Sequence, residues 1–120
     1  MNKKTLVLGA STNPSRYSYL AIQRLISNMH EVKAIGRKEG EINSVKIHTT
    51  KKIFKDIHTI TLYLNHKNQV EFYDYIISLK PKRVIFNPGT ENIELENLLF
   101  KNNIAFEEAC TLVLLGIGEY

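Results

Sequence analysis

Short apolar runs alternate along the whole chain with segments that repeat their apolar residues at the helical spacing. The runs are rich in β-branched and aromatic residues and end at turn residues, which is typical of buried strands. The helical spacing is clearest at Ile22, Leu25, Ile26 and Met29, which occupy positions i, i+3, i+4 and i+7 of one face. Strands are predicted at residues 5–8, 31–35, 45–47, 59–64, 83–86 and 104–106, and helices at about 18–28, at 70–79 and around 95–99.

Strands that alternate with amphipathic helices imply a parallel sheet, because each parallel strand needs a crossover that packs on a face of the sheet. The main elements follow the order β-α-β-β-α-β-α-β, and residues 45–47 add a small strand. We therefore expect an α/β fold, a Rossmann-like doubly wound parallel β-sheet in a three-layer α/β/α sandwich. Ligands of such sheets bind beyond the carboxyl ends of the strands. The loops to consider are residues 9–19, 36–41, 63–67 and 87–92.

The length and the charge of the chain indicate how many domains it forms and which kind of ligand it suits. The 120 residues are enough for one hydrophobic core and too few for two, so we expect a single domain over residues 1–120. Sixteen Lys and Arg against twelve Asp and Glu leave a net charge of +4, and these charges are interspersed along the chain. Without a clustered basic face, the balance suits a phosphorylated small molecule better than a nucleic acid.

Cysteine and histidine usage restricts the chemistry further. Cys110 is the only cysteine, so neither an internal disulfide nor a zinc cluster of several thiolates can form. The four histidines lack metal-ligand spacing, so no metal site is predicted.

No apolar stretch approaches the roughly 20 residues that cross a bilayer, and no signal peptide is expected. The cytoplasm is the expected compartment.

The first loop combines a glycine with short polar side chains. Gly9 permits a tight turn and the close approach of a ligand, and Ser11, Thr12, Asn13 and Ser15 add hydrogen-bonding groups. The loop ends just before a helix, whose free N–H groups and dipole favour an anion. It contains neither the G-x-G-x-x-G fingerprint nor the Lys-Ser/Thr ending of a Walker loop. It is therefore either a phosphate cradle or a βα turn that needs glycine.

The second strand ends at Gly36, Arg37 and Lys38, where NAD sites usually carry an acidic residue for the ribose hydroxyls. Two cations at this point suit a phosphate on the adenosine ribose, as in NADP or coenzyme A, and disfavour NAD. The alternative interpretation is a solvated basic turn.

A third candidate segment follows the strand at residues 83–86. Asn87, Pro88 and Gly89 form a rigid turn with a polar rim that can shape one wall of a pocket. Asn92 is predicted to cap the next helix. In the first loop, Tyr19 and its neighbour Tyr17 can cover a bound ligand.

Cys110 is a possible nucleophile, because a lone intracellular thiol reacts when its pKa is depressed. Its neighbours Glu107 and Glu108 are negative, however, and a nearby negative charge raises the pKa of a thiol. We interpret Cys110 as a packed structural thiol, and the sequence indicates no catalytic residue.

Three stretches together resemble the small stand-alone CoA-binding proteins of Rossmann type, which are similar to the CoA-binding domain of the succinyl-CoA synthetase alpha subunit. They are VLGASTNPSRYSY at residues 7–19, FNPGTEN at 86–92 and EEACTLVLL at 107–115. The resemblance spans essentially the whole chain. It implies a coenzyme A or acyl-CoA ligand, and it does not imply ligase activity, because the ligases carry a further domain with a phosphorylated histidine.

The resemblance also implies a layout for the ligand. The pantetheine-diphosphate region is expected near Gly9, Ala10, Ser11, Asn13, Pro14 and Arg16. The adenosine end is expected near Gly36, Arg37 and Lys38, and Asn87, Pro88 and Gly89 are expected to line the pantetheine side.

Two functions remain open from the sequence. The first is a non-catalytic or regulatory module that binds coenzyme A or an acyl-CoA, because the candidate site offers donors and cations but no acid–base pair. The second is a small NADP-binding oxidoreductase domain, which Arg37 and Lys38 tolerate. Such domains normally need a further substrate-binding region, for which this chain is short. The expected partner is a small molecule, with no nucleic acid and no membrane.

Overall fold

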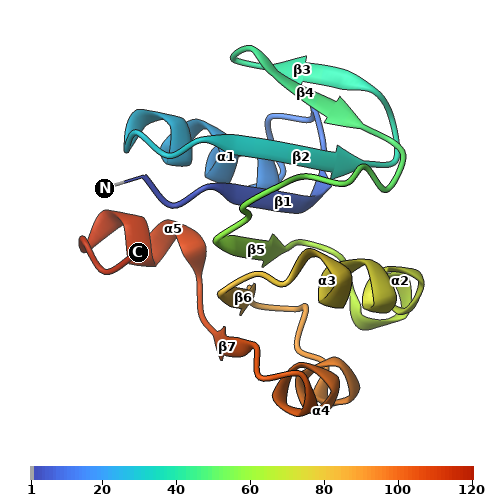
Figure 1. The fold of residues 1–120 in the computed structure, drawn as a ribbon. Helices are drawn as coiled ribbons and strands as arrows, with labels where there is room; N and C mark the ends of the chain where they lie inside the picture. Colours follow the sequence, from blue (N-terminus) through green and yellow to red (C-terminus); the bar gives the residue numbers. More distant parts are fainter. Residues whose placement is uncertain (1) are drawn as a thin grey trace.

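The computed structural model describes residues 2–120, which form a twisted sheet covered by helices on both faces (Figure 1). The strands are β1 (Thr5–Ala10), β2 (Val32–Gly36), β3 (Gly40–Ile42), β4 (Val45–His48), β5 (Thr59–Leu62), β6 (Arg83–Phe86) and β7 (Ala105–Glu108). The helices are α1 (Tyr17–Ser27), α2 (His66–Gln69), the 3-10 helix η1 (Val70–Phe72), α3 (Tyr73–Leu79), α4 (Ile93–Lys101) and α5 (Thr111–Gly116).

The sheet has the strand order of the dinucleotide-binding folds. Its order is β3-β4-β2-β1-β5-β6-β7, and every neighbouring pair is parallel except β3 with β4. Numbered along the chain, the six parallel strands lie in the order 3-2-1-4-5-6, which is the Rossmann order. The predicted fold class is confirmed. The strand order reverses between the parallel strands β1 and β5, and such sheets bind their ligands at this switch point.

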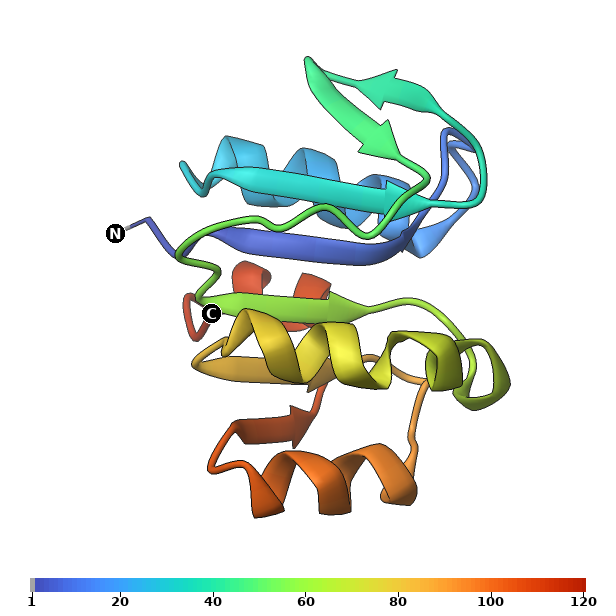
Figure 2. The same ribbon diagram turned by 45° about the vertical axis from the view of Figure 1, so that its right-hand side comes forward.

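Successive side chains of a strand point to opposite faces of the sheet and so form two apolar layers, one on each face. In β1, Leu6 and Leu8 belong to one buried cluster, whereas Val7 and Ala10 belong to the other. The first cluster packs under α3 and α4, and the second under α1 and α5; Figure 2 shows the two pairs of helices in front of the sheet and behind it. Burial of these side chains on both faces explains why the strands are continuous apolar runs.

The crossover from β4 to β5 lacks a helix. Residues 49–58 connect β4 to β5 in irregular structure and lie over the α3 side of the sheet. Ile57 is buried in the first cluster, Phe54 packs against it, and the hydroxyl of Tyr75 on α3 donates a hydrogen bond to the carbonyl of Lys52. This segment therefore covers the part of the sheet that a crossover helix would otherwise cover.

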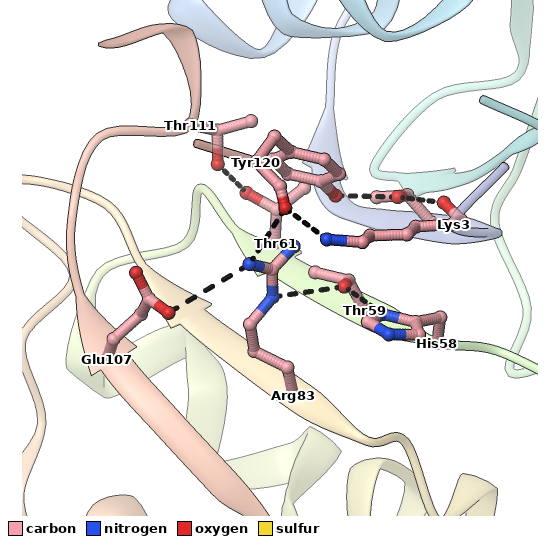
Figure 3. A network of polar contacts seen from close by, with 9 residues as sticks. Lys3, His58, Thr59, Thr61, Arg83, Glu107, Thr111 and Tyr120 are labelled. Atoms are coloured by element: carbon pink, nitrogen blue, oxygen red, sulfur yellow. Dashed lines mark hydrogen bonds and ion pairs between the residues drawn. The ribbon is translucent and has the colours of Figure 1, made fainter. Parts of the chain in front are cut away.

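Helix α5 is held on the sheet by hydrogen bonds as well as by apolar packing (Figure 3). The hydroxyls of Thr111 and Thr61 are 2.8 Å apart, and the hydroxyl of Tyr120 lies 2.6 Å from that of Thr5. The guanidinium of Arg83 stacks over the ring of Tyr120 at 4.5 Å and lies 3.9 Å from the Glu107 carboxylate. These contacts fix the chain after β7 against the centre of the sheet.

The structure corrects the predicted elements in three respects. Residues 40–42 form the edge strand β3, which lies in a segment that the sequence describes only as a polar loop. Residues 111–116 form α5, for which the sequence predicts no element because six residues are too few to show a helical period. The helix predicted at 70–79 is divided into α2, η1 and α3 and begins earlier, at His66. Within residues 2–120, no helix combines the length and the apolar character needed to span a bilayer.

Candidate ligand site at the carboxyl ends of the strands

The candidate loops lie along one side of the molecule. The segments after β1, β2, β5 and β6 all leave the sheet at its carboxyl edge, on the right in Figure 2. They are residues 11–16, 37–39, 63–65 and 87–92. The structure therefore brings together the four loops that the sequence selects.

Gly9 marks an irregularity at the end of β1. Its φ is +102°, and the pairing of β1 with β2 shifts register between Leu8 and Ala10. A β-carbon on residue 9 would lie 2.9 Å from the carbonyl carbon of Tyr63, which follows β5. Glycine is thus required here for backbone packing across the switch point. Its contact with a ligand stays a prediction.

Two further glycines allow the segment after β2 to pack closely against the loop after β1. A β-carbon on Gly36 would lie 2.2 Å from the carbonyl oxygen of Ala10, and one on Gly40 would lie 2.5 Å from the methyl carbon of Thr12. The chain after β2 and the β3 hairpin therefore pack directly on the loop that follows β1. This brings the segment with Arg37 and Lys38 beside the loop at residues 11–16.

The loop at residues 11–16 is ordered by its own side chains. Asn13 Oδ1 accepts hydrogen bonds from the backbone N–H of Ser15 at 3.0 Å and from its hydroxyl at 2.8 Å, and the N–H of Asn13 donates to Ser11 Oγ at 3.1 Å. Asn13, Pro14 and Arg16 are exposed, and Ser11 is half-buried. These bonds shape a short turn that leads into α1.

The N-terminus of α1 carries no side-chain cap. Arg16 holds the N-cap position in an extended conformation, its side chain caps no N–H group, and the first turn contains no acidic residue. The first N–H groups of a helix have no partner within the helix, so this end has a partial positive charge. Tyr19, in the first turn of α1, is half-buried and packs against the apolar cluster under this helix. The end of α1 can therefore accept an anion.

Arg37 and Lys38 are both exposed. Among residues 2–120, the ion pairs join Lys4 and Lys33 with Glu31, and Arg83 with Glu107. Neither Arg37 nor Lys38 takes part in them, so both charges are available to a ligand.

Asn87 has a structural role that sequence reasoning missed. Its side chain is only 2% exposed, and its Nδ2 donates hydrogen bonds to Thr61 Oγ1 at 2.6 Å and to the Leu62 carbonyl at 2.8 Å. Its Oδ1 accepts the N–H of Thr111 at 2.9 Å. The amide thus ties β6 to β5 and to the start of α5. No local signal identifies Thr61 and Thr111 as its partners, because they are far away in the sequence.

The rest of this loop divides into an exposed rim and a helix cap. Pro88 and Gly89 are exposed, and Gly89 has a φ of +92° with open space where a β-carbon would stand. Asn92 Oδ1 accepts hydrogen bonds from the N–H groups of Glu94 and Leu95, at 3.1 and 3.3 Å. The predicted capping role of Asn92 is confirmed.

Two ionisable groups near the carboxyl edge also escape sequence analysis. Burial raises the pKa of Tyr63, which follows β5, to about 12. Burial, with the neighbouring carboxylates of Glu108 and Glu91, raises the pKa of Glu96 on α4 to about 7.

Cys110 is half-buried at the N-cap of α5 and forms no disulfide. In the part of the chain that the structure describes, no three His, Cys, Asp or Glu side chains are grouped to hold a metal.

Comparisons with solved structures agree with the fold. A crystal structure of an uncharacterized protein shares 50% identity, with a TM-score of 0.97 over 100% of this chain and 99% of that chain. A hypothetical protein from Pyrococcus horikoshii OT3 shares 22% identity, with a TM-score of 0.83 over 91% of this chain and 78% of that chain.

A longer protein contains a similar unit. The dinucleotide-forming acetyl-coenzyme A synthetase 1 of Ca. Korarchaeum cryptofilum matches with 15% identity and a TM-score of 0.72. The match covers 90% of this chain and 26% of the synthetase chain, so the likeness concerns the fold of one part of that enzyme. The comparison with curated proteins gave no match.

A family comparison covers nearly the whole chain. The family model described as a CoA binding domain matches residues 3–116, which include all the loops at the carboxyl edge. The chain therefore belongs to the CoA binding domain family.

Proposed function

We propose that this protein binds coenzyme A or an acyl-CoA across the carboxyl ends of its parallel strands. The observation that carries the proposal is the packing of Gly36 on Ala10 and of Gly40 on Thr12. This packing joins an uncapped helix end, suited to a diphosphate, to a segment with two free cations, suited to a further phosphate. Coenzyme A carries phosphate at both of these positions.

The proposed contacts follow the order of the loops along the edge. The diphosphate lies against the first loop and the start of α1, the 3′-phosphate of the adenosine lies near the two cations, and pantetheine passes the loop after β6. The proposed contact residues are Gly9, Ala10, Ser11, Asn13, Pro14, Arg16, Tyr19, Gly36, Arg37, Lys38, Asn87, Pro88 and Gly89. The Asn87 amide is bonded within the protein, and its backbone carbonyl accepts hydrogen bonds from the N–H and the hydroxyl of Thr90. We therefore propose that Asn87 forms the buried base of the pantetheine side and that its exposed neighbours Pro88 and Gly89 make the direct contacts.

We further propose that the protein is a non-catalytic or regulatory binding module of the cytoplasm. The residues proposed to contact the ligand supply hydrogen-bond donors and cations rather than a paired acid and base. The competing proposal, an NADP-binding oxidoreductase domain, rests on the same two cations at the end of β2.

A ligand panel separates the two proposals. Melting temperatures of the purified chain are measured with coenzyme A, acetyl-CoA, dephospho-CoA, NAD and NADPH. A ligand at a hundredfold above its Kd stabilises the folded state by about 2.7 kcal/mol, which gives a clear shift in a domain of this size. We expect the shift with coenzyme A and not with NAD. A shift with NADPH and none with millimolar coenzyme A would establish the competing proposal.

A further inference from the structure

A groove lies beyond the proposed pantetheine contacts, between η1 and the start of α4. Its volume is about 440 Å³, and Val70 and Ile93 form its apolar walls. The remaining lining residues of this Val70–Ile93 groove are polar, namely His66, Tyr73, Glu91, Asn92 and Glu94. It is reached from the carboxyl edge of the sheet, because α2 and η1 follow β5, and α4 follows the loop after β6 (Figure 2).

The two apolar walls are open to solvent. The side chain of Val70 is 55% exposed and that of Ile93 is 75% exposed. An aliphatic group placed between them would remove apolar surface from water on both sides, which is favourable.

Three polar side chains of the groove, those of Asn92, Tyr73 and Glu94, form one hydrogen-bond network. Asn92 Nδ2 donates hydrogen bonds to Gln69 Oε1 and to the hydroxyl of Tyr73, both at 2.8 Å. The hydroxyl of Tyr73 in turn donates to Glu94 Oε1 at 2.9 Å. An aliphatic guest therefore leaves no polar group of this network without a partner, which is the usual penalty for covering a polar surface. The network also holds the groove in shape before any ligand arrives.

The rim of the groove is negative. Glu91 and Glu94 are both exposed, and among the residues that the structure describes neither forms an ion pair with a cation. Glu91 Oε1 accepts the N–H of Gly89 at 2.9 Å, which keeps this carboxylate beside the exposed loop. Two carboxylates at the entrance repel a guest that carries a carboxylate of its own.

The groove continues the path proposed for the ligand. Successive strands lie about 4.8 Å apart, so the loops after β2 and β6, three spacings apart, are separated by roughly 14 Å. A ligand with its adenosine end at the loop after β2 and its pantetheine at Pro88 and Gly89 has its thiol end next to Glu91 and Asn92, which line the groove.

Resting on the proposed function, we infer that the Val70–Ile93 groove receives the acyl group of an acyl-CoA and selects uncharged aliphatic acyl groups over carboxylated ones. The test compares coenzyme A, butyryl-CoA and succinyl-CoA by isothermal titration calorimetry. We expect butyryl-CoA to bind about fivefold more tightly than coenzyme A, since its methylenes are partly buried. Succinyl-CoA, of similar length, should bind at least about fivefold more weakly than butyryl-CoA.

Matched variants localise the effect. Ile93→Ser should bring the affinity for butyryl-CoA down to that for coenzyme A, and leave coenzyme A binding unchanged. Phe100→Ser is the control, because Phe100 is 77% exposed on the same helix and lies outside the groove. Glu94→Gln should improve the binding of succinyl-CoA, and Asp74→Asn, which alters an exposed acid outside the groove, should not.

The outcomes distinguish the inference from the proposal on which it rests. Equal affinities for the three ligands, or equal effects of Ile93→Ser and Phe100→Ser, would overturn the inference while coenzyme A binding stands. No binding of any CoA ligand by the folded chain would overturn the proposed function, and the inference with it.

Discussion

The carbonyl oxygen of Ala10 occupies the space that a side chain at Gly36 would need. A β-carbon on residue 36 would approach that oxygen to 2.2 Å, far inside van der Waals contact. The ends of β1 and β2 can therefore pack this closely only because residue 36 has no side chain. This contact sets the spacing between the two loops proposed to bind the phosphates of the ligand.

Gly36→Ala tests whether the close packing of residue 36 on the carbonyl oxygen of Ala10 stabilises the fold. The new methyl group must displace backbone, so we expect a loss of about 2 kcal/mol or more in the free energy of unfolding. Gly116→Ala is the matched control, because a β-carbon on Gly116 meets nothing within 4 Å. The control should stay within about 0.5 kcal/mol of the wild type. Urea denaturation measures both, and equal stabilities for the two variants would contradict the packing role.

Gly9→Val should lose stability and coenzyme A binding together. The side chain would strike the backbone of Tyr63, and the φ of +102° adds strain for any residue but glycine. Gly118→Ala separates the two effects, because Gly118 also has a positive φ, of +74°, but has open space around it and lies outside the proposed site. The control should lose only about 1 kcal/mol in the free energy of unfolding and should keep its affinity for coenzyme A. Circular dichroism accompanies the titration, and a folded Gly9→Val protein with unchanged affinity would remove this loop from the site.

Arg37→Ala combined with Lys38→Ala should erase the preference for coenzyme A over dephospho-CoA. We expect the wild type to show a preference of about 1 to 2 kcal/mol, the range for charge-assisted hydrogen bonds. Salt should weaken it, because exposed charges are screened over about 8 to 10 Å. The control is Lys82→Ala with Lys101→Ala, which removes two exposed cations elsewhere. Calorimetry with both ligands is the measurement, and equal losses for the two ligands would mean that the 3′-phosphate has another partner.

Cys110→Ala should keep the affinity for coenzyme A within about threefold, since a packed thiol contributes contacts rather than chemistry. The expected loss of stability is about 1 kcal/mol from the missing sulfur contacts. Mass spectrometry after incubation with acyl-CoA under reducing conditions is the sensitive check. A covalent adduct that appears in the wild type and disappears in Cys110→Ala would assign a reactive role to this residue.

Stability should fall as the pH rises through neutrality because of Glu96. Its pKa of about 7 in the folded protein lies above the ordinary value of 4.5, so the folded state holds this proton more tightly than the unfolded chain. The stabilising contribution is complete below about pH 4.5 and is lost as the pH rises through about 7. Urea denaturation at pH 5 and pH 8 should show a smaller difference in Glu96→Gln than in the wild type. The exposed Glu71→Gln should behave like the wild type, and an unchanged pH dependence in Glu96→Gln would refute the assignment.

Local patterns were sufficient for much of the fold. The helical repeat at Ile22, Leu25, Ile26 and Met29 and the apolar strand runs each depend on a few neighbouring residues. Because parallel strands need crossovers of one hand, this alternation restricts the topology strongly. The loops at the carboxyl ends follow from the same reasoning. So does the capping role of Asn92, which depends only on the N–H groups of Glu94 and Leu95, two and three residues further along the chain.

Elements with a weak local pattern were not predictable. Strand β3 has three residues and only one buried apolar side chain, Ile42, so it exists through its pairing with β4. Helix α5 is too short to reveal a period, and it is fixed by the bonds of Thr111 to Thr61 and Asn87. The deciding contacts of α5 join residues that are far apart in the sequence, whereas β3 pairs with β4 across a short turn and lacks only an apolar pattern of its own.

The same division applies to the site. The amino-acid pattern was enough to predict the fold class, the edge of the sheet at which a ligand would bind and the residue types that favour phosphate. The folded chain was needed to show that Gly9 and Gly36 serve backbone packing, that the Asn87 amide is bonded within the protein, and that Glu96 lies beside Glu108. The physical reason is that periodicity and turn preference are local properties of the chain. Steric contact, burial and shared protons depend on which distant residues the completed fold brings into contact.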